Sequence, residues 1–313
     1  MRPASPCYAA RVPAAPAPST LRRVRRSLLS WYAADHRDFP WRQTRDPYAV
    51  LVSEVMLQQT QAARIAERFP PFMLRFPTAE SLAFAPTAAV LAAWSGLGYN
   101  RRALALQRTA VIVARDGWPR DVAGLERLPG IGPYTARAVA SLAFGTPVGV
   151  VDTNVRRWLV RRFGGPDQPR RLQVLSDALA APGQGSDVGA WTHASMEFGA
   201  AICRSRDPRC EVCPVAHGCP SRGTAANVAV PRQPALRGSD RAYRGALLRL
   251  LSAADGHALE GQRLREDLAR DAGRIGPVLD EAGWTRVVDA LVRDGLAHRS
   301  GGSVRLGTAT IGA

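Results

Sequence analysis

Apolar residues recur at helical spacing through most of the chain before the cysteine-rich segment. The first such segment places Leu21, Val24, Leu28 and Trp31 on one face, with Thr20 in position to cap the helix. No stretch in this part has the strict alternation that is typical of a strand. The pattern therefore predicts an all-α fold. Further helices are expected after Asp46-Pro47 and over residues 78–84, 87–94, 101–116, 173–180 and 188–203.

A glycine-rich break interrupts this pattern at Leu128-Pro129-Gly130-Ile131-Gly132-Pro133-Tyr134-Thr135. Pro129 ends a short helical run, the two glycines permit backbone angles that other residues avoid, and Pro133 suits the first turn of a new helix. The segment is predicted to form a helix–hairpin–helix, whose bare N–H groups and helix N-terminus favour an anion. An ordinary turn between packed helices is the alternative interpretation.

An aspartate stands at the entry of the next helix. A short apolar run, residues 147–151, delivers Asp152 to the start of a helix expected over 153–162. Taken alone, Asp152 is most simply an N-cap. A hairpin followed about twenty residues later by such a carboxylate, however, resembles the helix–hairpin–helix DNA glycosylases, whose signature ends in a catalytic aspartate.

A second carboxylate lies in the helix that follows Pro47. Glu54 shares its helix face with Leu51, Val55 and Gln58, so its carboxyl is expected to be partly withdrawn from water. Burial disfavours the charged form and raises the pKa of a carboxyl above its reference of about 4.3, which suits a general acid. A surface glutamate at an interface with arginine neighbours is the alternative.

Longer motifs around Glu54 sharpen the resemblance. The run from Ser53 to Gln61, with Pro40-Trp41-Arg42 before it and Trp94-Ser95-Gly96-Leu97-Gly98-Tyr99 after it, is similar to the MutY family of adenine DNA glycosylases over residues 21–222. The resemblance implies that Glu54 protonates an adenine mispaired with 8-oxoguanine. It also implies that Asp152, ordered by Asn154, stabilises the oxocarbenium-like sugar. This is glycoside chemistry with two carboxylates, performed on a base that has left the stack.

Tyr134 separates this chain from bifunctional relatives, which carry a lysine at that position and cleave the strand through a Schiff base. Tyrosine cannot form an imine, so a monofunctional glycosylase is predicted; a tyrosine packed against the hairpin is the alternative. The family pattern has a second tyrosine after Tyr99, where this chain has Asn100. The resemblance also assigns substrate-binding positions to Arg37, Trp41, Arg42, His193 and Met196, and DNA-binding positions to Gln58, Gln59, Tyr99, Leu128, Gly130, Gly132 and Thr135.

Composition supports a nucleic-acid partner. The chain has 313 residues and a net charge of +16, carried by arginine, which indicates a polyanionic partner such as nucleic acid or an anionic membrane surface. No run approaches transmembrane length. We expect the protein to be cytoplasmic and nucleoid-associated, and to bind as a monomer to double-stranded DNA that contains A:8-oxoguanine or A:G mispairs.

Four of the five cysteines are grouped. Cys203, Cys210, Cys213 and Cys219 are separated by six, two and five residues, which is a strong metal signal, and four thiolates can hold zinc or a [4Fe–4S] cluster. Only one close Cys-x-x-Cys pair is present, whereas structural zinc usually uses two. The spacing is similar to that of the glycosylase iron–sulfur loop, so the resemblance implies a [4Fe–4S] cluster. Cys7 is expected to be an idle thiol.

The remaining segments suggest further divisions. Residues 1–19 are expected to be a disordered arm, 20–222 a two-lobed helix–hairpin–helix glycosylase domain with its iron–sulfur loop at 203–219, and 223–240 a linker. In the tail, 241–313, helices are expected over 243–253, 263–269 and 284–294. Residues 296–299 and 303–306 are expected to pair around Gly301-Gly302. These elements suggest a small winged-helix-like module.

The tail does not match the Nudix-like domain with which MutY relatives commonly read 8-oxoguanine. We therefore expect weaker discrimination between A:8-oxoguanine and A:G than in longer relatives. Two rival functions stay open at this point. One is a thymine/uracil mismatch glycosylase of the same superfamily, and the other is a non-catalytic helix–hairpin–helix DNA-binding protein.

Overall fold

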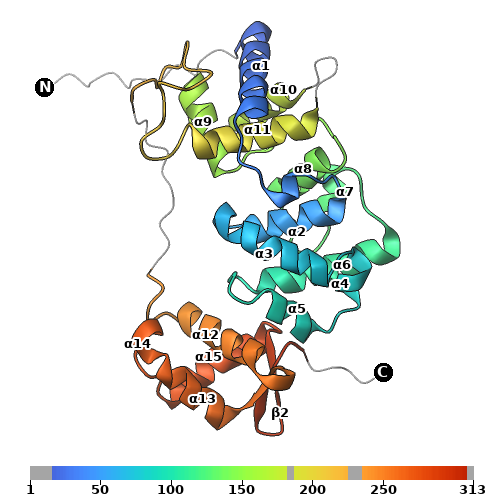
Figure 1. The fold of residues 1–313 in the computed structure, drawn as a ribbon, viewed down its shortest axis with the longest axis vertical. Helices are drawn as coiled ribbons and strands as arrows, with labels where there is room; N and C mark the ends of the chain where they lie inside the picture. The colour runs from blue at the N-terminus through green and yellow to red at the C-terminus, as the bar shows by residue number, and fades with distance from the viewer. Residues whose placement is uncertain (1–15, 182–186, 225–234, 309–313) are drawn as a thin grey trace, which may run out of the picture. The chain divides into compact units, whose positions relative to one another are not determined.

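The protein is mostly helical, as predicted (Figure 1). The computed structural model describes residues 16–181, 187–224 and 235–308, and residues outside these ranges, Cys7 among them, lie beyond the description. The described helices are α1 (Pro18–Ala34), η1 (Pro40–Arg42), α2 (Pro47–Leu57), α3 (Ala62–Arg75), α4 (Ala79–Ala83), α5 (Thr87–Ala93), α6 (Arg101–Asp116), α7 (Val122–Glu126), α8 (Pro133–Leu142), α9 (Thr153–Phe163), α10 (Pro169–Ala180), α11 (Val188–Ala201), α12 (Asp240–Ala253), η2 (Asp255–His257), α13 (Gly261–Arg270), α14 (Ala272–Ile275) and α15 (Glu281–Arg293).

The chain divides into two compact units. The first takes Met1–Val50, Arg120–Leu125 and Gly132–Pro231, and the second takes Leu51–Pro119, Glu126–Ile131 and Arg232–Ala313. This division follows packing rather than chain order, and it passes through α2. The domain boundaries expected from the sequence remain a prediction.

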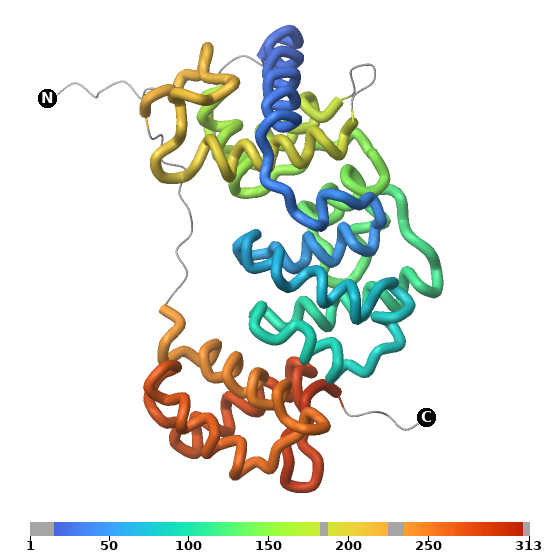
Figure 2. The backbone as a smooth tube through the Cα atoms, viewed as in Figure 1, coloured from blue at the N-terminus to red at the C-terminus, as the bar shows by residue number. Residues whose placement is uncertain are grey.

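The core of the first unit is built by helices that are distant in the sequence. α1 packs against α10 and α11, and α9 packs against both of them (Figure 2). Trp158 of α9 is fully buried and meets the rings of Trp191 and Phe198 of α11 edge-on, at centroid distances of 6.5 and 5.6 Å. Val24 and Leu28 of α1 join the same cluster. The tight α9–α11 contact is what fixes the entry of α9, where Asp152 stands.

The second unit contains helices α3 to α6 from the first half of the chain and the helices and strands of the tail. Phe72 of α3 meets Trp94 edge-on at 5.8 Å, and both are buried. Gln107 of α6 is buried, and its amide donates to the carbonyls of Leu82 and Ala85 at 3.3 and 2.7 Å, which satisfies the end of α4.

Helix boundaries depart from the prediction in several places; α10, for example, begins at Pro169 rather than at residue 173. α1 begins at Pro18, so Thr20 lies inside the helix rather than capping it, because proline is well suited to the first turn. α2 ends at Leu57, which leaves Gln58 and Gln59 in a turn. α3 was not predicted, because Pro70 and Pro71 stand inside it and such a pair normally argues against a helix.

The tail has the predicted helices and hairpin, with two additional short helices, η2 and α14, and an additional strand. β2 (Ala297–Ser300) and β3 (Ser303–Leu306) pair antiparallel, and β1 (Ala258–Glu260) pairs with β3 to give the order β1-β3-β2. Three longer helices, α12, α13 and α15, stand with this small sheet. No helix within the described ranges is long and apolar enough to span a membrane.

Candidate active site and DNA-contact surface

The glycine hairpin has one position that only glycine can fill. Gly130 has φ +74°, and a Cβ there would lie 2.5 Å from the Cβ of Ala105 on α6. The hydroxyl of Thr109 donates to the carbonyl of Pro129 at 3.0 Å, which ties the same turn to α6. A hollow of about 370 Å³ lies against the hairpin and is lined by Gly130, Ile131 and three arginines, Arg101, Arg102 and Arg108. This surface suits a phosphate.

Gly132 differs from the expectation. Its φ of −93° lies in the extended region that any residue adopts, so the backbone does not require glycine there. A Cβ at Gly132 would meet no atom within 4 Å, and the residue is exposed. The missing side chain therefore leaves open space in front of the N-terminus of α8.

Three residues near the hairpin glycines, Leu128, Tyr134 and Thr135, are buried or half-buried. Leu128 and Thr135 are buried, at 5% and 2% exposure, so they support the hairpin from beneath rather than offering a free surface. Tyr134 is half-buried in the first turn of α8. The assignment of these residues to DNA binding or catalysis remains a prediction.

Asp152 is held in one orientation by a chain of hydrogen bonds. One carboxylate oxygen accepts from the backbone N–H of Val155 at 2.6 Å, which makes Asp152 the N-cap of α9, and the other accepts from the amide of Asn154 at 2.8 Å. Arg157 donates to the Asn154 oxygen at 2.9 Å. Because Arg157 can only donate, the Asn154 oxygen must face it and the Asn154 NH₂ must face Asp152. The predicted ordering of Asp152 by Asn154 is thus present.

The environment of Asp152 pulls its pKa in two directions. Burial raises the pKa, while hydrogen bonds from Val155 and Asn154 and the charge of Arg157 lower it, and the net result lies above the ordinary value. The carboxyl therefore ionises at a higher pH than a free aspartate.

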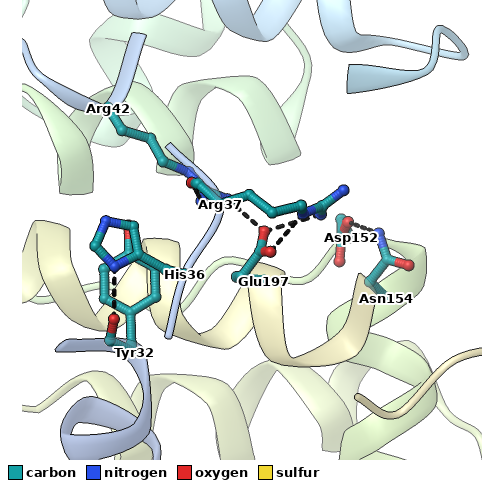
Figure 3. Close-up of polar contacts among 7 residues, drawn as sticks. All are labelled: Tyr32, His36, Arg37, Arg42, Asp152, Asn154 and Glu197. Atoms are coloured by element: carbon teal, nitrogen blue, oxygen red, sulfur yellow. Dashed lines mark hydrogen bonds and ion pairs between the residues drawn. The ribbon is translucent and has the colours of Figure 1, made fainter. Parts of the chain in front are cut away.

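The residues assigned to the base pocket converge on a carboxylate that the sequence did not single out. Glu197 of α11 is 1% exposed; it accepts from Arg37 at 2.5 and 2.9 Å and from Arg42 at 2.7 Å (Figure 3). Burial would raise the pKa of Glu197, but the hydrogen bonds from both arginines outweigh it and hold that pKa below its usual range. The ion pair fixes both guanidinium groups to α11.

Aromatic rings complete this cluster. Trp41 is buried and stacks on Phe39 at 4.7 Å, and the Arg42 guanidinium lies over Phe39 at 5.0 Å. Met196 packs against the core at partial burial. Burial lowers the pKa of His193 to about 3, assisted by the charge of Arg42, so its imidazole is neutral at physiological pH.

In the second unit, Glu54 is 4% exposed, as predicted for a withdrawn carboxyl. Gln59 and Tyr99 both have positive φ, 56° and 49°, although neither is a glycine. Arg102 joins the two turns. It donates to the carbonyls of Val55 and Gln58, both at 2.6 Å, and lies over the Tyr99 ring at 5.3 Å. Burial lowers the pKa of Arg102 to about 10, so the side chain stays charged at neutral pH.

Glu54 belongs to the second unit, whereas Asp152, Asn154 and the Glu197 cluster belong to the first. The structure thus joins Asp152 to Asn154, Arg37 to Arg42 through Glu197, and Gln58 to Tyr99 through Arg102. A shared pocket between Glu54 and Asp152 remains a prediction.

The four grouped cysteines line one small cavity with Arg161 and Arg162 of α9. Arg161 lies 3.7 Å from the Cys203 sulfur, and Cys219 donates weakly to the Arg161 carbonyl at 3.4 Å. Burial raises the pKa of Cys213 to about 11. Within the described ranges, no three His, Cys, Asp or Glu side chains are grouped so that they could hold a metal ion. The thiols therefore share a cavity without converging on one point.

Comparisons with known proteins agree with this geometry. The HhH-GPD superfamily base excision DNA repair protein family matches residues 52–180. An adenine DNA glycosylase of Mycobacterium tuberculosis is 40% identical over 287 residues, which covers 88% of this chain and 90% of the relative. The chain belongs to the HhH-GPD superfamily, among the adenine DNA glycosylases.

Pyrimidine-directed members of the superfamily are similar over a shorter region. A thymine/uracil-DNA glycosylase of Methanothermobacter thermautotrophicus is 33% identical over 202 residues, covering 62% of this chain and 90% of the relative. The solved structure of a thermostable thymine-DNA glycosylase aligns with a TM-score of 0.60 at 32% identity, covering 64% of this chain and 96% of that chain. Family membership therefore confirms the predicted helix–hairpin–helix glycosylase fold and the DNA repair function, while the iron–sulfur loop and the winged-helix-like form of the tail remain predictions.

Three functional side chains were missed from the sequence of this glycosylase. Arg157 lies three residues after Asn154 on the same helix, a spacing that could have indicated the contact. Glu197 gave no local signal, because Arg37 and Arg42 lie more than 150 residues away in the chain. The contacts of Arg102 with the carbonyls of Val55 and Gln58 gave none either, because they span more than forty residues.

The two hairpin glycines offer a matched test. Gly130→Ala combines a left-handed backbone with a methyl clash, so it should lower the free energy of unfolding by roughly 2–4 kcal/mol. Gly132→Ala should lower the free energy of unfolding by no more than about 1 kcal/mol, the usual effect of alanine at an N-cap, but weaken duplex binding severalfold, because its methyl fills the space in front of α8. Urea unfolding and fluorescence anisotropy measure the two effects. Full DNA affinity in Gly132→Ala would mean that the hairpin is only a structural turn.

Capping and catalysis at Asp152 can be separated because asparagine caps helices as well as aspartate does. Asp152→Asn should keep the thermal midpoint close to wild type and slow single-turnover excision at least about a hundredfold, because the negative charge is lost. Asp187, which caps α11 by accepting from Ala190 at 3.2 Å, is the matched control. A rate in Asp152→Asn equal to that of Asp187→Asn would reduce Asp152 to a cap.

The pH profile should carry the same signature. The role predicted for Asp152 needs its ionised carboxylate, so the excision rate should fall as pH drops through the raised pKa of Asp152. Asn154→Ala removes a hydrogen bond that lowers this pKa. Its acid limb should therefore lie at higher pH than that of the wild type.

Proposed function

We propose that this adenine DNA glycosylase hydrolyses the N-glycosidic bond of adenine paired with 8-oxoguanine or guanine in double-stranded DNA, and that it leaves the strand intact. The observation that carries the choice of adenine is the extent of the similarity. Residues 241–313 are 73 of 313 residues, so a match covering 88% of the chain extends into the tail. The thymine/uracil relative covers only 62% of the chain.

The proposed reaction uses the two carboxyls in different protonation states. Glu54, buried in α2, gives a proton to the adenine ring as the bond to C1′ breaks and the bonding electrons leave with the base. The Asp152 carboxylate, aimed by Val155 and Asn154, faces the positive charge that develops on the sugar. Water then supplies the oxygen that bonds to C1′, and ionised Glu54 can accept its proton.

Arg37, Arg42 and Glu197 support this chemistry by position. The Arg42 side chain is 10% exposed and paired to Glu197, so its guanidinium group is held in one position. We assign this cluster, with Trp41, His193 and Met196, to the wall of the adenine pocket. The neutral imidazole of His193 can donate or accept a hydrogen bond to a purine edge.

Thymine or uracil excision is the second candidate, and the similarity to a thymine/uracil-DNA glycosylase favours it. A purine needs protonation to become a good leaving group, so the buried Glu54 favours adenine over a pyrimidine. The two candidates therefore differ in how strongly they depend on Glu54.

Single-turnover assays on duplexes with A:8-oxoguanine, A:G, T:G and U:G should yield adenine release from the first two only. Glu54→Gln should slow that release by roughly 10²- to 10⁴-fold, the usual contribution of a general acid. Glu67→Gln, an exposed glutamate on α3 of the same unit, is the matched control. Borohydride should trap no more than a trace of covalent complex, because Tyr134 has no amine. Release of thymine or uracil, or a full rate with Glu54→Gln, would overturn the assignment.

We further propose that Cys203, Cys210, Cys213 and Cys219 hold a [4Fe–4S] cluster. The donor set fits such a group: four thiols line one cavity, and Arg161 and Arg162 stand beside them to offset thiolate charge. When bound, the cluster would supply an ordered loop and a charged centre rather than a step on the base. The need for reduced thiols supports a cytoplasmic location, and we propose that the protein acts there as a nucleoid-associated monomer.

Substitution of one ligand should test this assignment. Cys213→Ser should lose most of its iron and acid-labile sulfide, because four thiolates are needed to hold the cluster. Cys7→Ser, outside the grouped cysteines, should keep wild-type iron. Iron and sulfide analysis with visible absorbance measures both. Zinc in place of iron in the purified wild type would contradict the proposal.

A further inference from the structure

A groove of about 850 Å³ lies in the second unit, between the turns that carry Gln59 and Tyr99 and the helix α12 of the tail. One wall comes from residues 95–102 and the turn after α2. The other comes from α12, with Asp294, Leu296 and Leu306 from the end of the tail. The tail thus shares a surface with Gln58, Gln59 and Tyr99, three residues assigned to DNA contact.

The groove is basic. Its lining includes six arginines and two aspartates: Arg64, Arg101, Arg102, Arg241, Arg244, Arg249, Asp240 and Asp294. Asp294 pairs with Arg244 and lies 3.9 Å from Arg101, and Asp240 pairs with Arg286 outside the groove. The arginines remain in excess, which favours a polyanionic occupant.

α12 presents its basic face to this groove. Arg241, Arg244, Leu248 and Arg249 line it over about two turns of the helix, while Tyr243 and Ala246 on the opposite face are buried. Arg241 and Arg249 are exposed, and Arg249 lies 3.5 Å from Asp271. One helix face therefore packs into the tail and the other offers guanidinium groups.

The opposite wall is rigid. Arg102 fixes the turns at Gln59 and Tyr99 from below through the carbonyls of Val55, Gln58 and Gly98. Tyr99 remains 41% exposed in its left-handed conformation. An exposed aromatic ring beside arginines is typical of nucleic-acid surfaces, because bases stack on the ring while guanidinium groups meet phosphates.

The end of the tail packs closely against α5 and α6 of the same unit. A Cβ at Gly307, just after β3, would lie 3.0 Å from the backbone nitrogen of Ala88 in α5. Gly295, before β2, lies near the Leu104 side chain of α6. The second wall is therefore held by contacts that leave little space for shifts.

We propose that this groove binds the sugar–phosphate backbone of duplex DNA beside the mispair, so that the tail adds a second set of phosphate contacts next to Gln59 and Tyr99. Arg241 and Arg249 meet the phosphates from α12, and Arg64 and Arg101 meet them from the facing wall. The inference rests on the proposed function for its ligand, DNA. In this proposal the tail contacts the DNA backbone and does not recognise 8-oxoguanine itself.

The test uses the full chain and a plain duplex without a mispair, labelled for fluorescence anisotropy and titrated over a range of salt concentrations. The slope of log K against log salt is negative, and each lost phosphate contact reduces its magnitude by about 0.9. The double variant Arg241→Ala with Arg249→Ala should therefore reduce the magnitude of the slope by about 1.8 and weaken binding about tenfold or more at 0.1 M salt. Arg274→Ala, an exposed arginine of α14 that does not line the groove, is the matched control and should match wild type.

Excision is measured separately. At saturating enzyme, single-turnover release of adenine from A:8-oxoguanine should stay within about twofold of wild type in the double variant, because the substituted residues lie outside the base pocket. A double variant with the wild-type salt slope would overturn the proposal and leave the groove to another occupant, such as an acidic protein segment. If wild type released no adenine, the proposed function would fail, while the salt slopes would still decide whether the groove binds DNA.

Discussion

The packing of α9 against α11 is the contact on which the first unit's chemistry depends. Gly199 of α11 brings the two helices so close that a Cβ there would lie 2.6 Å from the carbonyl oxygen of Asn154. Arg157 spans the same contact, donating to the carbonyls of Gly199 and Cys203 and to Asn154. One interhelical contact therefore orients Asn154, the partner of Asp152, lies two residues from Glu197 on α11, and stands just before the segment of the four grouped cysteines. A shift of α11 would disturb all three together.

Buried arginines link the helices to the cysteine loop in a way that apolar packing could not. Arg161 donates to the carbonyl of Arg204 at 2.6 Å and Arg162 to that of Gly218 at 3.0 Å, and burial lowers the pKa of Arg162. A loop with little regular structure leaves many carbonyls without ladder partners, and guanidinium groups with several donors satisfy them. The excess of arginine thus serves the interior as well as a polyanionic ligand.

Sequence reasoning recovered what is local. The helix of Glu54, the hairpin at Gly130, the cap at Asp152 and the terminal hairpin all follow from spacing and turn chemistry within about ten residues. It failed where distant segments meet. Glu197 is 160 residues from Arg37 and 155 residues from Arg42 in the chain, and neither segment alone contains a pattern that predicts the ion pair. Gly132 shows the opposite error, since a glycine was given a conformational reason when the structure shows an ordinary backbone conformation and open space around its Cα.

The contact between Gly130 and Ala105 constrains two distant positions at once. With their Cβ positions 2.5 Å apart, neither residue can grow without displacing the other, so alanine on α6 is as restricted as the glycine it faces. Homologues that enlarge one position must therefore shift the helix or redraw the turn, and the two columns of an alignment should vary jointly or not at all. Residue 105 carries no chemistry, yet selection on the hairpin acts on it directly.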